Sequence, residues 1–106
     1  MWSFDDCETL KAAVHRYYGA NATERPEVSI DQWDVSRVTD MSDLFRGCYT
    51  FNEDISLWDV SGVTNMRAMF CSTSFNQPVG GWDVSNVTDM AQMFFDTHAF
   101  NLPLDT

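Results

Sequence analysis

The sequence repeats one phrase three times: WDVSRVTDM at residues 33–41, WDVSGVTNM at residues 58–66 and WDVSNVTDM at residues 82–90. Its tryptophans, Trp33, Trp58 and Trp82, recur at an almost constant period. A fixed period of this length is typical of stacked repeats, in which each copy buries its apolar face against the next. We expect residues 30–106 to form a three-coil solenoid that ends in a partial fourth repeat.

Columns of like residues extend the register beyond the phrase. They predict ladders of aromatic and aliphatic side chains that form one continuous core, and a ladder of asparagine amides that satisfies backbone groups at a turn. The phenylalanine columns are Phe45, Phe70 and Phe94, and then Phe51, Phe75 and Phe100; the asparagine column is Asn52, Asn76 and Asn101.

Each copy changes its period part-way. Trp58 and Val60 alternate with Asp59, as in a strand with Trp and Val inward. The following apolar positions step by three, as in a helix, and Thr64 is placed to cap it, like Thr39 and Thr88 in the other copies. The sequence thus predicts an α/β repeat with a strand and a short helix in each coil.

Residues 1–29 differ from the rest of the chain. Residues 3–18 have apolar positions on one helical face, with Ser3 and Asp6 resembling a capping box and Gly19 as the stop. Pro26 interrupts any helix in the segment that follows. We expect residues 1–29 to form an N-terminal capping helix and a linker, with the helix covering the first coil.

Charge and composition restrict the function. The 106-residue chain has sixteen acidic and six basic residues, a net charge of −10. Such a surface repels phosphate backbones and anionic lipids, and no apolar run approaches the roughly 20 residues that span a bilayer. We expect neither nucleic-acid binding nor membrane insertion. The three cysteines have no metal-type spacing, which indicates free thiols or a Cys48–Cys71 bridge.

Catalytic residues are not indicated. The only histidines are His15 and His98, far apart in the chain, and no Cys/His pair or glycine-rich phosphate loop is present. Catalysis needs unlike residues that converge, whereas here the polar residues recur in columns. The sequence predicts a protein that is not an enzyme.

The aspartates of the phrase, Asp34, Asp59 and Asp83, form a column of carboxylates. Two such charges at strand spacing repel by about 1 kcal/mol in water, so something must offset the repulsion. Each Asp can form an Asx-turn with the serine two positions on. The alternative is a Ca²⁺ ion bridging the column; no other metal or cofactor is expected.

The positions that differ between copies are candidates for specificity, because surface columns of a solenoid vary while core columns stay fixed. Arg37 and Asn86 share one such column, and Asp43 and Gln92 share another; Arg67 belongs to a third. The alternative is that these side chains are merely solvated.

The phrase, followed by Met-Phe or Leu-Phe and then Phe-Asn, resembles the BspA-like leucine-rich-repeat surface proteins, especially the roughly 25-residue lipoprotein-type repeat of mycoplasmas. The resemblance covers residues 30–104. It implies a leucine-rich-repeat-like solenoid, a location at the cell surface, adhesion or protein binding, and no catalytic residues. The chain differs in having few repeats, in beginning with MWSFDD rather than a signal peptide, and in ending at residues 103–106, where a fourth WDV is due.

Together these patterns predict a non-catalytic module that binds a protein partner. The alternative is a small structural subunit docked into a larger assembly through an open C-terminal edge, since an unpaired edge is a template for pairing. Self-association through the terminal coil belongs to the same alternative. A third class, a cation-stabilised scaffold, depends on the aspartate column.

Overall fold

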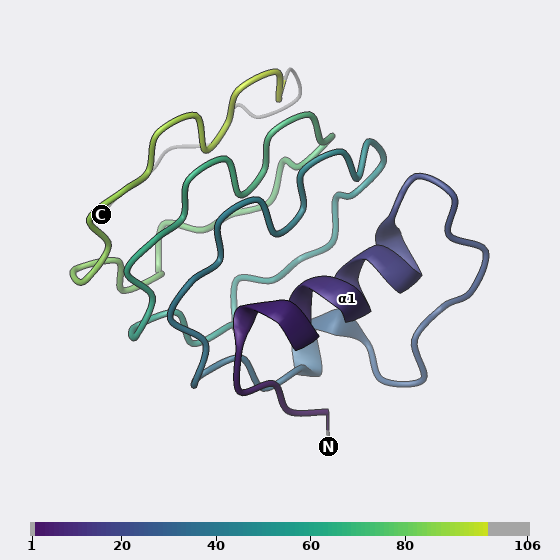
Figure 1. Cartoon of the computed structure of the whole chain (residues 1–106), viewed down its shortest axis with the longest axis horizontal. Helices are drawn as coiled ribbons and strands as arrows, with labels where there is room; N and C mark the ends of the chain where they lie inside the picture. The colour runs from purple at the N-terminus through teal and green to yellow at the C-terminus, as the bar shows by residue number, and fades with distance from the viewer. Residues whose placement is uncertain (1, 98–106) are drawn as a thin grey trace.

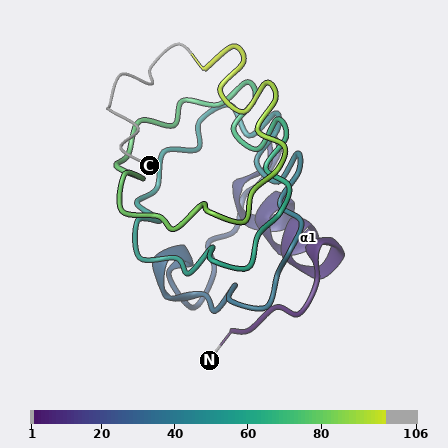
Figure 2. The same cartoon turned by 90° about the vertical axis from the view of Figure 1, so that its left-hand side faces the viewer.

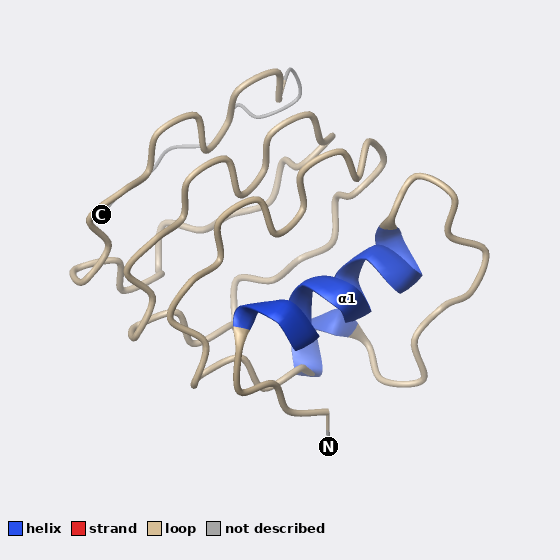
Figure 3. Ribbon diagram, in the orientation of Figure 1, coloured by secondary structure: helices blue, strands red, loops and turns tan. Residues whose placement is uncertain are grey.

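The computed structural model describes residues 2–97, in which regular secondary structure is confined to the N-terminal part (Figures 1 and 3). Helix α1 spans Cys7–Tyr18 and the 3₁₀ helix η1 spans Ile30–Gln32. The three repeats that follow are stacked windings of turns, linked by isolated parallel bridges between Asp40, Asn65 and Asp89. The predicted strand and short helix in each coil of a leucine-rich-repeat-like solenoid are therefore wrong.

Backbone hydrogen bonding explains why no helix forms in the described repeats. In the first repeat, alternate amides donate to the second repeat at 2.8–3.1 Å, from Met41, Asp43, Phe45 and Gly47 to the carbonyls of Asn65, Arg67, Met69 and Cys71. The amides of Leu44, Arg46 and Cys48 donate to the carbonyl three positions back, and the Ser42 amide donates to the Asp40 side chain at 2.8 Å. In an α-helix, each of these amides would instead donate to the carbonyl four residues earlier in the chain. The apolar spacing of three comes from consecutive turns.

Left-handed backbone conformations produce this alternation. Asp43, Ala68 and Gln92 occupy one column with φ of 57°, 55° and 59°. Gly47, Ser72 and Asp96 occupy the column four positions on, also with positive φ. Glycine is the residue that usually marks such positions, and neither column carries it throughout. No common residue type therefore identifies these turns in the sequence.

The threonines lack a helix to cap and bond across the stack instead. The Thr64 hydroxyl donates to the Thr39 carbonyl at 3.2 Å, and the Thr88 hydroxyl donates to the Thr64 carbonyl at 3.1 Å. The indoles do the same, from Trp58 to the Ile30 carbonyl at 2.8 Å and from Trp82 to the Ile55 carbonyl at 3.2 Å. Side chains that reach one repeat back thus reinforce the stacking.

The predicted core ladders are confirmed. The rings of Phe45 and Phe70, and those of Phe70 and Phe94, are stacked with centroids 5.5 Å apart. Trp58 and Val60 are buried and Asp59 is exposed, as predicted, although no strand forms there. The side-chain oxygen of Asn52 accepts from the Asn76 amide at 2.7 Å. Phe100 and Asn101, with the predicted partial fourth repeat, lie outside the described residues.

Helix α1 covers the first repeat, with Leu10 and Val14 fully buried (Figures 1 and 2). It begins at Cys7, not at residue 3, with Asp6 as N-cap accepting from the Thr9 amide at 2.8 Å. Its C-cap is Gly19, as predicted.

The expected helical start is wrong because the chain before α1 pairs with the first repeat. The Phe4 amide donates to the Asp34 carbonyl at 3.0 Å, and the Asp34 amide donates to the Trp2 carbonyl at 2.8 Å. These two bonds hold residues 2–4 in an extended conformation, which excludes them from the helix.

The cysteines are free thiols, so the alternative of a Cys48–Cys71 bridge is wrong. Cys48 and Cys71 are buried and Cys7 is half-buried. Burial raises the pKa of Cys48 to about 11, so its unreactive thiol form dominates near neutral pH. The two buried thiols serve as core side chains.

Candidate interaction surfaces

The aspartate column forms three Asx-turns. Each carboxylate accepts from the serine two positions on, at 3.0–3.1 Å from the amide and 2.6 Å from the hydroxyl. The serine hydroxyl, and next the serine amide, lower the pKa of Asp34, Asp59 and Asp83. The negative charges of Asp34 and Asp83 act in the opposite direction on the pKa of Asp59. The Asx-turn interpretation is confirmed.

Among the described residues, no cluster of ligands supports the alternative of a Ca²⁺ ion bridging the aspartate column. Within residues 2–97, no group of three or more His, Cys, Asp or Glu side chains is placed to hold a metal ion. The carboxylates of the column each face their own serine. No helix in the same part of the chain is both long and apolar enough to cross a membrane.

The predicted specificity residues connect neighbouring layers rather than converge. Arg37 forms an exposed ion pair with Asp5 at 3.4 Å, and Arg67 lies 3.8 Å from Asp89. The side-chain amide of Asn86 donates to the Ser61 carbonyl at 2.8 Å. Solvent-exposed ion pairs of this kind contribute about 0–1 kcal/mol each.

Asp43 and Gln92 lie in the left-handed column described above, in the first and the last repeat. The Asp43 amide donates to the second repeat, and its side chain pairs with Arg46 at 3.3 Å. Gln92 is exposed on the last repeat. The structure therefore does not bring the five predicted residues into one site. Of Asp43 and Gln92, only Gln92 lies on a side of the stack that no other segment of residues 2–97 covers.

Within residues 2–97, no segment covers the outer side of the third repeat at residues 88–92 and at Phe95, and we call this surface the terminal edge. Figure 1 shows the third repeat at the opposite end of the stack from α1. Met41 and Met66 are fully buried, whereas Met90 in the same column is 41% exposed. Phe95 is 62% exposed. The methionine column thus reaches solvent at Met90, and an exposed aromatic ring lies in the same repeat.

Backbone groups at the terminal edge also lack the bonds that their counterparts make. The amides of Met90 and Gln92 correspond to those of Met66 and Ala68, which donate to the third repeat at 2.8 and 2.9 Å. Neither the Met90 nor the Gln92 amide has an acceptor among residues 2–97. The Thr88 carbonyl likewise accepts from no donor in that range, whereas the Thr64 carbonyl accepts from Thr88.

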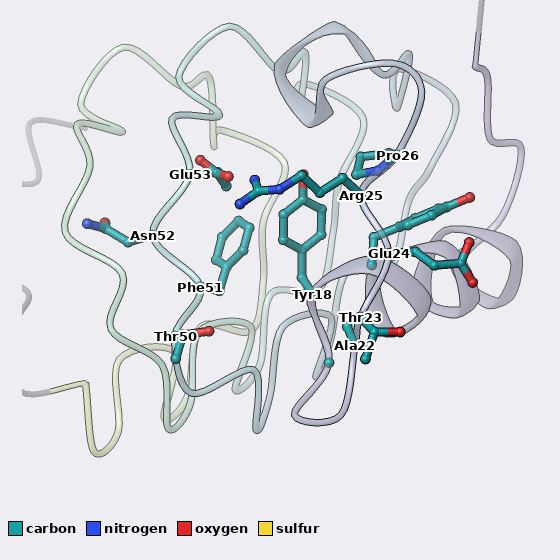
Figure 4. Close-up of a pocket in the computed structure, with 12 residues that line it drawn as sticks. Tyr18, Ala22, Thr23, Glu24, Arg25, Pro26, Thr50, Phe51, Asn52 and Glu53 are labelled. Atoms are coloured by element: carbon teal, nitrogen blue, oxygen red, sulfur yellow. The ribbon is translucent and has the colours of Figure 1, made fainter.

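A cavity of about 380 Å³ lies between the end of α1, residues 22–26 and residues 50–53 (Figure 4). The Arg25 side chain extends beside the ring of Tyr18 toward Glu53 (Figure 4). Burial, and next the charge of Glu53, raise the pKa of Tyr18 to about 12, so the Tyr18 hydroxyl stays neutral. The described lining of the cavity contains neither histidine nor cysteine, and it pairs no nucleophile with a base.

The sequence did not indicate this cavity, because the segment between α1 and the repeats has only the features of a linker. Its walls come from segments that are distant in the chain, residues 17–26 and residues 50–53, which no local pattern connects. The terminal edge carries a clearer signal, because Met90 in the third copy of the phrase occupies the column of Met41 and Met66.

The family comparison covers both α1 and the repeats. The model of the DUF285 family, described as Mycoplasma protein of unknown function, matches residues 9–106. The chain belongs to this DUF285 family. Neither a curated protein nor a solved structure matches it significantly. The family assignment agrees with the mycoplasma-type repeat that the sequence resembles, and it assigns no activity.

Proposed function

We propose that this DUF285 protein is a non-catalytic protein-interaction module that binds its partner through the terminal edge. The observation that carries the proposal is the 41% exposure of Met90, in a column whose other members are fully buried. Apolar side chains beside backbone amides that have no acceptor among residues 2–97 form a surface that a polypeptide, rather than a small polar ligand, can cover.

The electrostatics of the third repeat favour a protein partner over a nucleic acid. Residues 82–97 include Asp83, Asp89 and Asp96 and no Lys or Arg. Phosphate groups would be repelled, whereas a neutral or basic polypeptide would not. The resemblance to BspA-like surface proteins supports a role in adhesion or protein binding at the cell surface.

A second candidate is a structural subunit that docks permanently into a larger assembly through the same edge. The exposure of both Met90 and Phe95 favours it, because permanent interfaces are more apolar than transient ones. The mass of the purified chain separates the two. A stable monomer supports the free-standing module, and aggregation or dimerisation that Met90→Asp abolishes supports the docked subunit.

Site-specific cross-linking tests the proposal. A photoreactive amino acid replaces Gln92 at the terminal edge. In a matched control it replaces Leu57, which lies before the second-repeat phrase and is 78% exposed. In an extract of the organism that carries the gene, we expect one defined protein to be cross-linked from position 92 and not from position 57. Equal labelling from both positions, or none from position 92, would contradict binding at this edge.

A further inference from the structure

We infer that the partner supplies a segment of this same repeat, which docks in parallel as the next winding of the stack. This inference rests on the proposed function and specifies its ligand. The two interfaces within the chain, between the first and second repeats and between the second and third, show what such a segment must offer. The terminal edge continues this established interface in the same register.

The donors of the terminal edge require carbonyls at alternate positions. Met41 and Met66 donate to the carbonyls of Asn65 and Asp89, each at 2.8 Å. Asp43 and Ala68 donate to the carbonyls of Arg67 and Ala91, each at 2.9 Å. In a docked Thr-Asx-Met phrase, the carbonyl of the Asx would therefore accept from the Met90 amide. The carbonyl two positions later would accept from the Gln92 amide.

One acceptor of the terminal edge requires a threonine. The Thr39 carbonyl accepts both the amide of Thr64, at 2.7 Å, and its hydroxyl, at 3.2 Å. The Thr64 carbonyl accepts the same two groups of Thr88, at 2.8 and 3.1 Å. The Thr88 carbonyl is the next member of this series, so it fits the threonine of a docked phrase.

A second acceptor, the Val79 carbonyl at the start of the third repeat, fits the indole of a tryptophan. The carbonyls of Ile30 and Ile55 accept the indoles of Trp58 and Trp82. The Val79 carbonyl occupies the next position in this series. An arbitrary extended peptide offers neither side-chain donor at the required spacing, whereas a further copy of the phrase offers both.

A second copy of the chain fits poorly through its first repeat, because that repeat is already covered. The rings of Trp2 and Phe4 lie 5.4 and 5.2 Å from the Trp33 ring, and the Asp34 backbone is paired with residues 2 and 4. A second copy therefore cannot present its first phrase to the terminal edge without losing these contacts.

Two terminal edges facing one another are also disfavoured. They would bring together Asp83 and Asp89 of both copies, with Arg67 beside Asp89 on each. Like charges across an interface disfavour that pairing. The occupant is therefore a repeat segment of another polypeptide, neutral or basic in charge.

A peptide with the sequence of residues 55–76 is a suitable probe, because it contains the complete second-repeat phrase and has one Asp and one Arg. Its binding to the full chain is measured by fluorescence anisotropy under reducing conditions. Amide hydrogen exchange locates the site on the chain. We expect saturable binding, slower exchange at Met90 and Gln92, and unchanged exchange along α1.

Substitutions in the chain and in the peptide distinguish docking in register from nonspecific contact. Met90→Asp in the chain should weaken binding at least about tenfold, because it places a charge in an apolar contact, whereas Leu57→Asp should leave binding unchanged. Thr64→Val and Trp58→Phe in the peptide, which remove one donor each, should each weaken binding about threefold or more. A scrambled peptide should not bind. These peptide variants do not depend on the folding of the chain.

Three results would overturn the inference: no saturable binding, protection located away from the terminal edge, or indifference to the peptide substitutions. Cross-linking from position 92 separates this failure from that of the proposed function. A cross-linked partner segment without the repeat phrase leaves the interaction module intact and removes the inference about its ligand. A partner segment that carries the phrase supports both.

Discussion

The second and third repeats have nearly the same sequence and different surroundings. Their phrases, at residues 58–66 and 82–90, differ at two positions only, where Gly62 and Asn65 are replaced by Asn86 and Asp89. Yet Met66 is fully buried and Met90 is 41% exposed. Burial in a stack thus depends on the neighbours on both sides, and within residues 2–97 the third repeat leaves the methionine column exposed at Met90 while Trp82 and Met93 stay buried.

The second and third repeats make the same contacts with the part of the stack that precedes each of them. Trp82 and Thr88 bond to earlier residues in the stack as Trp58 and Thr64 do. Their contacts on the other side differ, because the Met66 and Ala68 amides donate to the third repeat. The third repeat is therefore well attached to the second, while its Met90 and Gln92 amides have no acceptor among residues 2–97.

Truncation of the methionine column should give the largest difference between these repeats. Met66→Ala removes a fully buried side chain between two layers, and we expect a loss of about 2–5 kcal/mol in the free energy of unfolding. Met90→Ala should cost about 1 kcal/mol, because the side chain is already partly in water and little cavity forms. Urea denaturation measures both, with Met41→Ala as a control that should behave like Met66→Ala. Equal losses at 66 and 90 would show that the third repeat is covered.

Substitutions of Thr64 and Thr88 should show that the second and third repeats are attached equally well to the repeat before them. Thr64→Val and Thr88→Val each remove one hydroxyl that donates one repeat back, at 3.2 and 3.1 Å. We expect each to lower the free energy of unfolding by about 1 kcal/mol or less, and by similar amounts. Thermal or urea denaturation of the two variants checks this. A loss at Thr64 with none at Thr88 would indicate that the third repeat is poorly attached, contrary to the structure.

The aspartate column should give the smallest effect. Hydrogen bonds from Ser61 hold the pKa of Asp59 below its ordinary value of 3.8, while the neighbouring carboxylates of Asp34 and Asp83 raise it. Asp59 should therefore titrate above Asp83, whose pKa is lowered in the same way by Ser85 but which has only one carboxylate of the column, Asp59, beside it. Carboxyl chemical shifts followed by NMR during acid titration measure this order.

The sign of the stability effect follows from the same shift. Because folding depresses the pKa of Asp59, its contribution is present at pH values above the ordinary value of 3.8 and is lost as the pH falls through the lower folded pKa. Ser61→Ala should raise the pKa of Asp59 and reduce the acid sensitivity of unfolding. A pKa of Asp59 that does not change in this variant would show that the Ser61 hydroxyl does not donate to Asp59 in solution.

Much of the packing could be predicted from sequence, because repetition reports it directly. The columns of Trp, Val, Met and Phe are the core ladders. The contacts of Asp59 with Ser61 and of Asn52 with Asn76 follow from residue chemistry at fixed spacing. Apolar periodicity reports which side chains face inward, whatever the backbone conformation.

Backbone conformation could not be predicted in the same way. Apolar steps of three fit a helix and a series of turns equally well, and the choice depends on whether alternate amides bond within or between repeats. The left-handed positions are filled by Asp43, Ala68 and Gln92, which have no common residue type. The start of α1 shifted to Cys7 because residues 2–4 pair with Asp34, which is distant in the chain. Such long-range bonds override local capping signals.

Amide hydrogen exchange of the isolated chain tests the openness of the terminal edge most directly. The amides of Met66 and Ala68 should exchange more than about a hundredfold more slowly than those of Met90 and Gln92, because the former open only when the stack opens. Comparable protection of all four amides in a monomer would contradict an open edge, and with it the binding surface proposed for this protein.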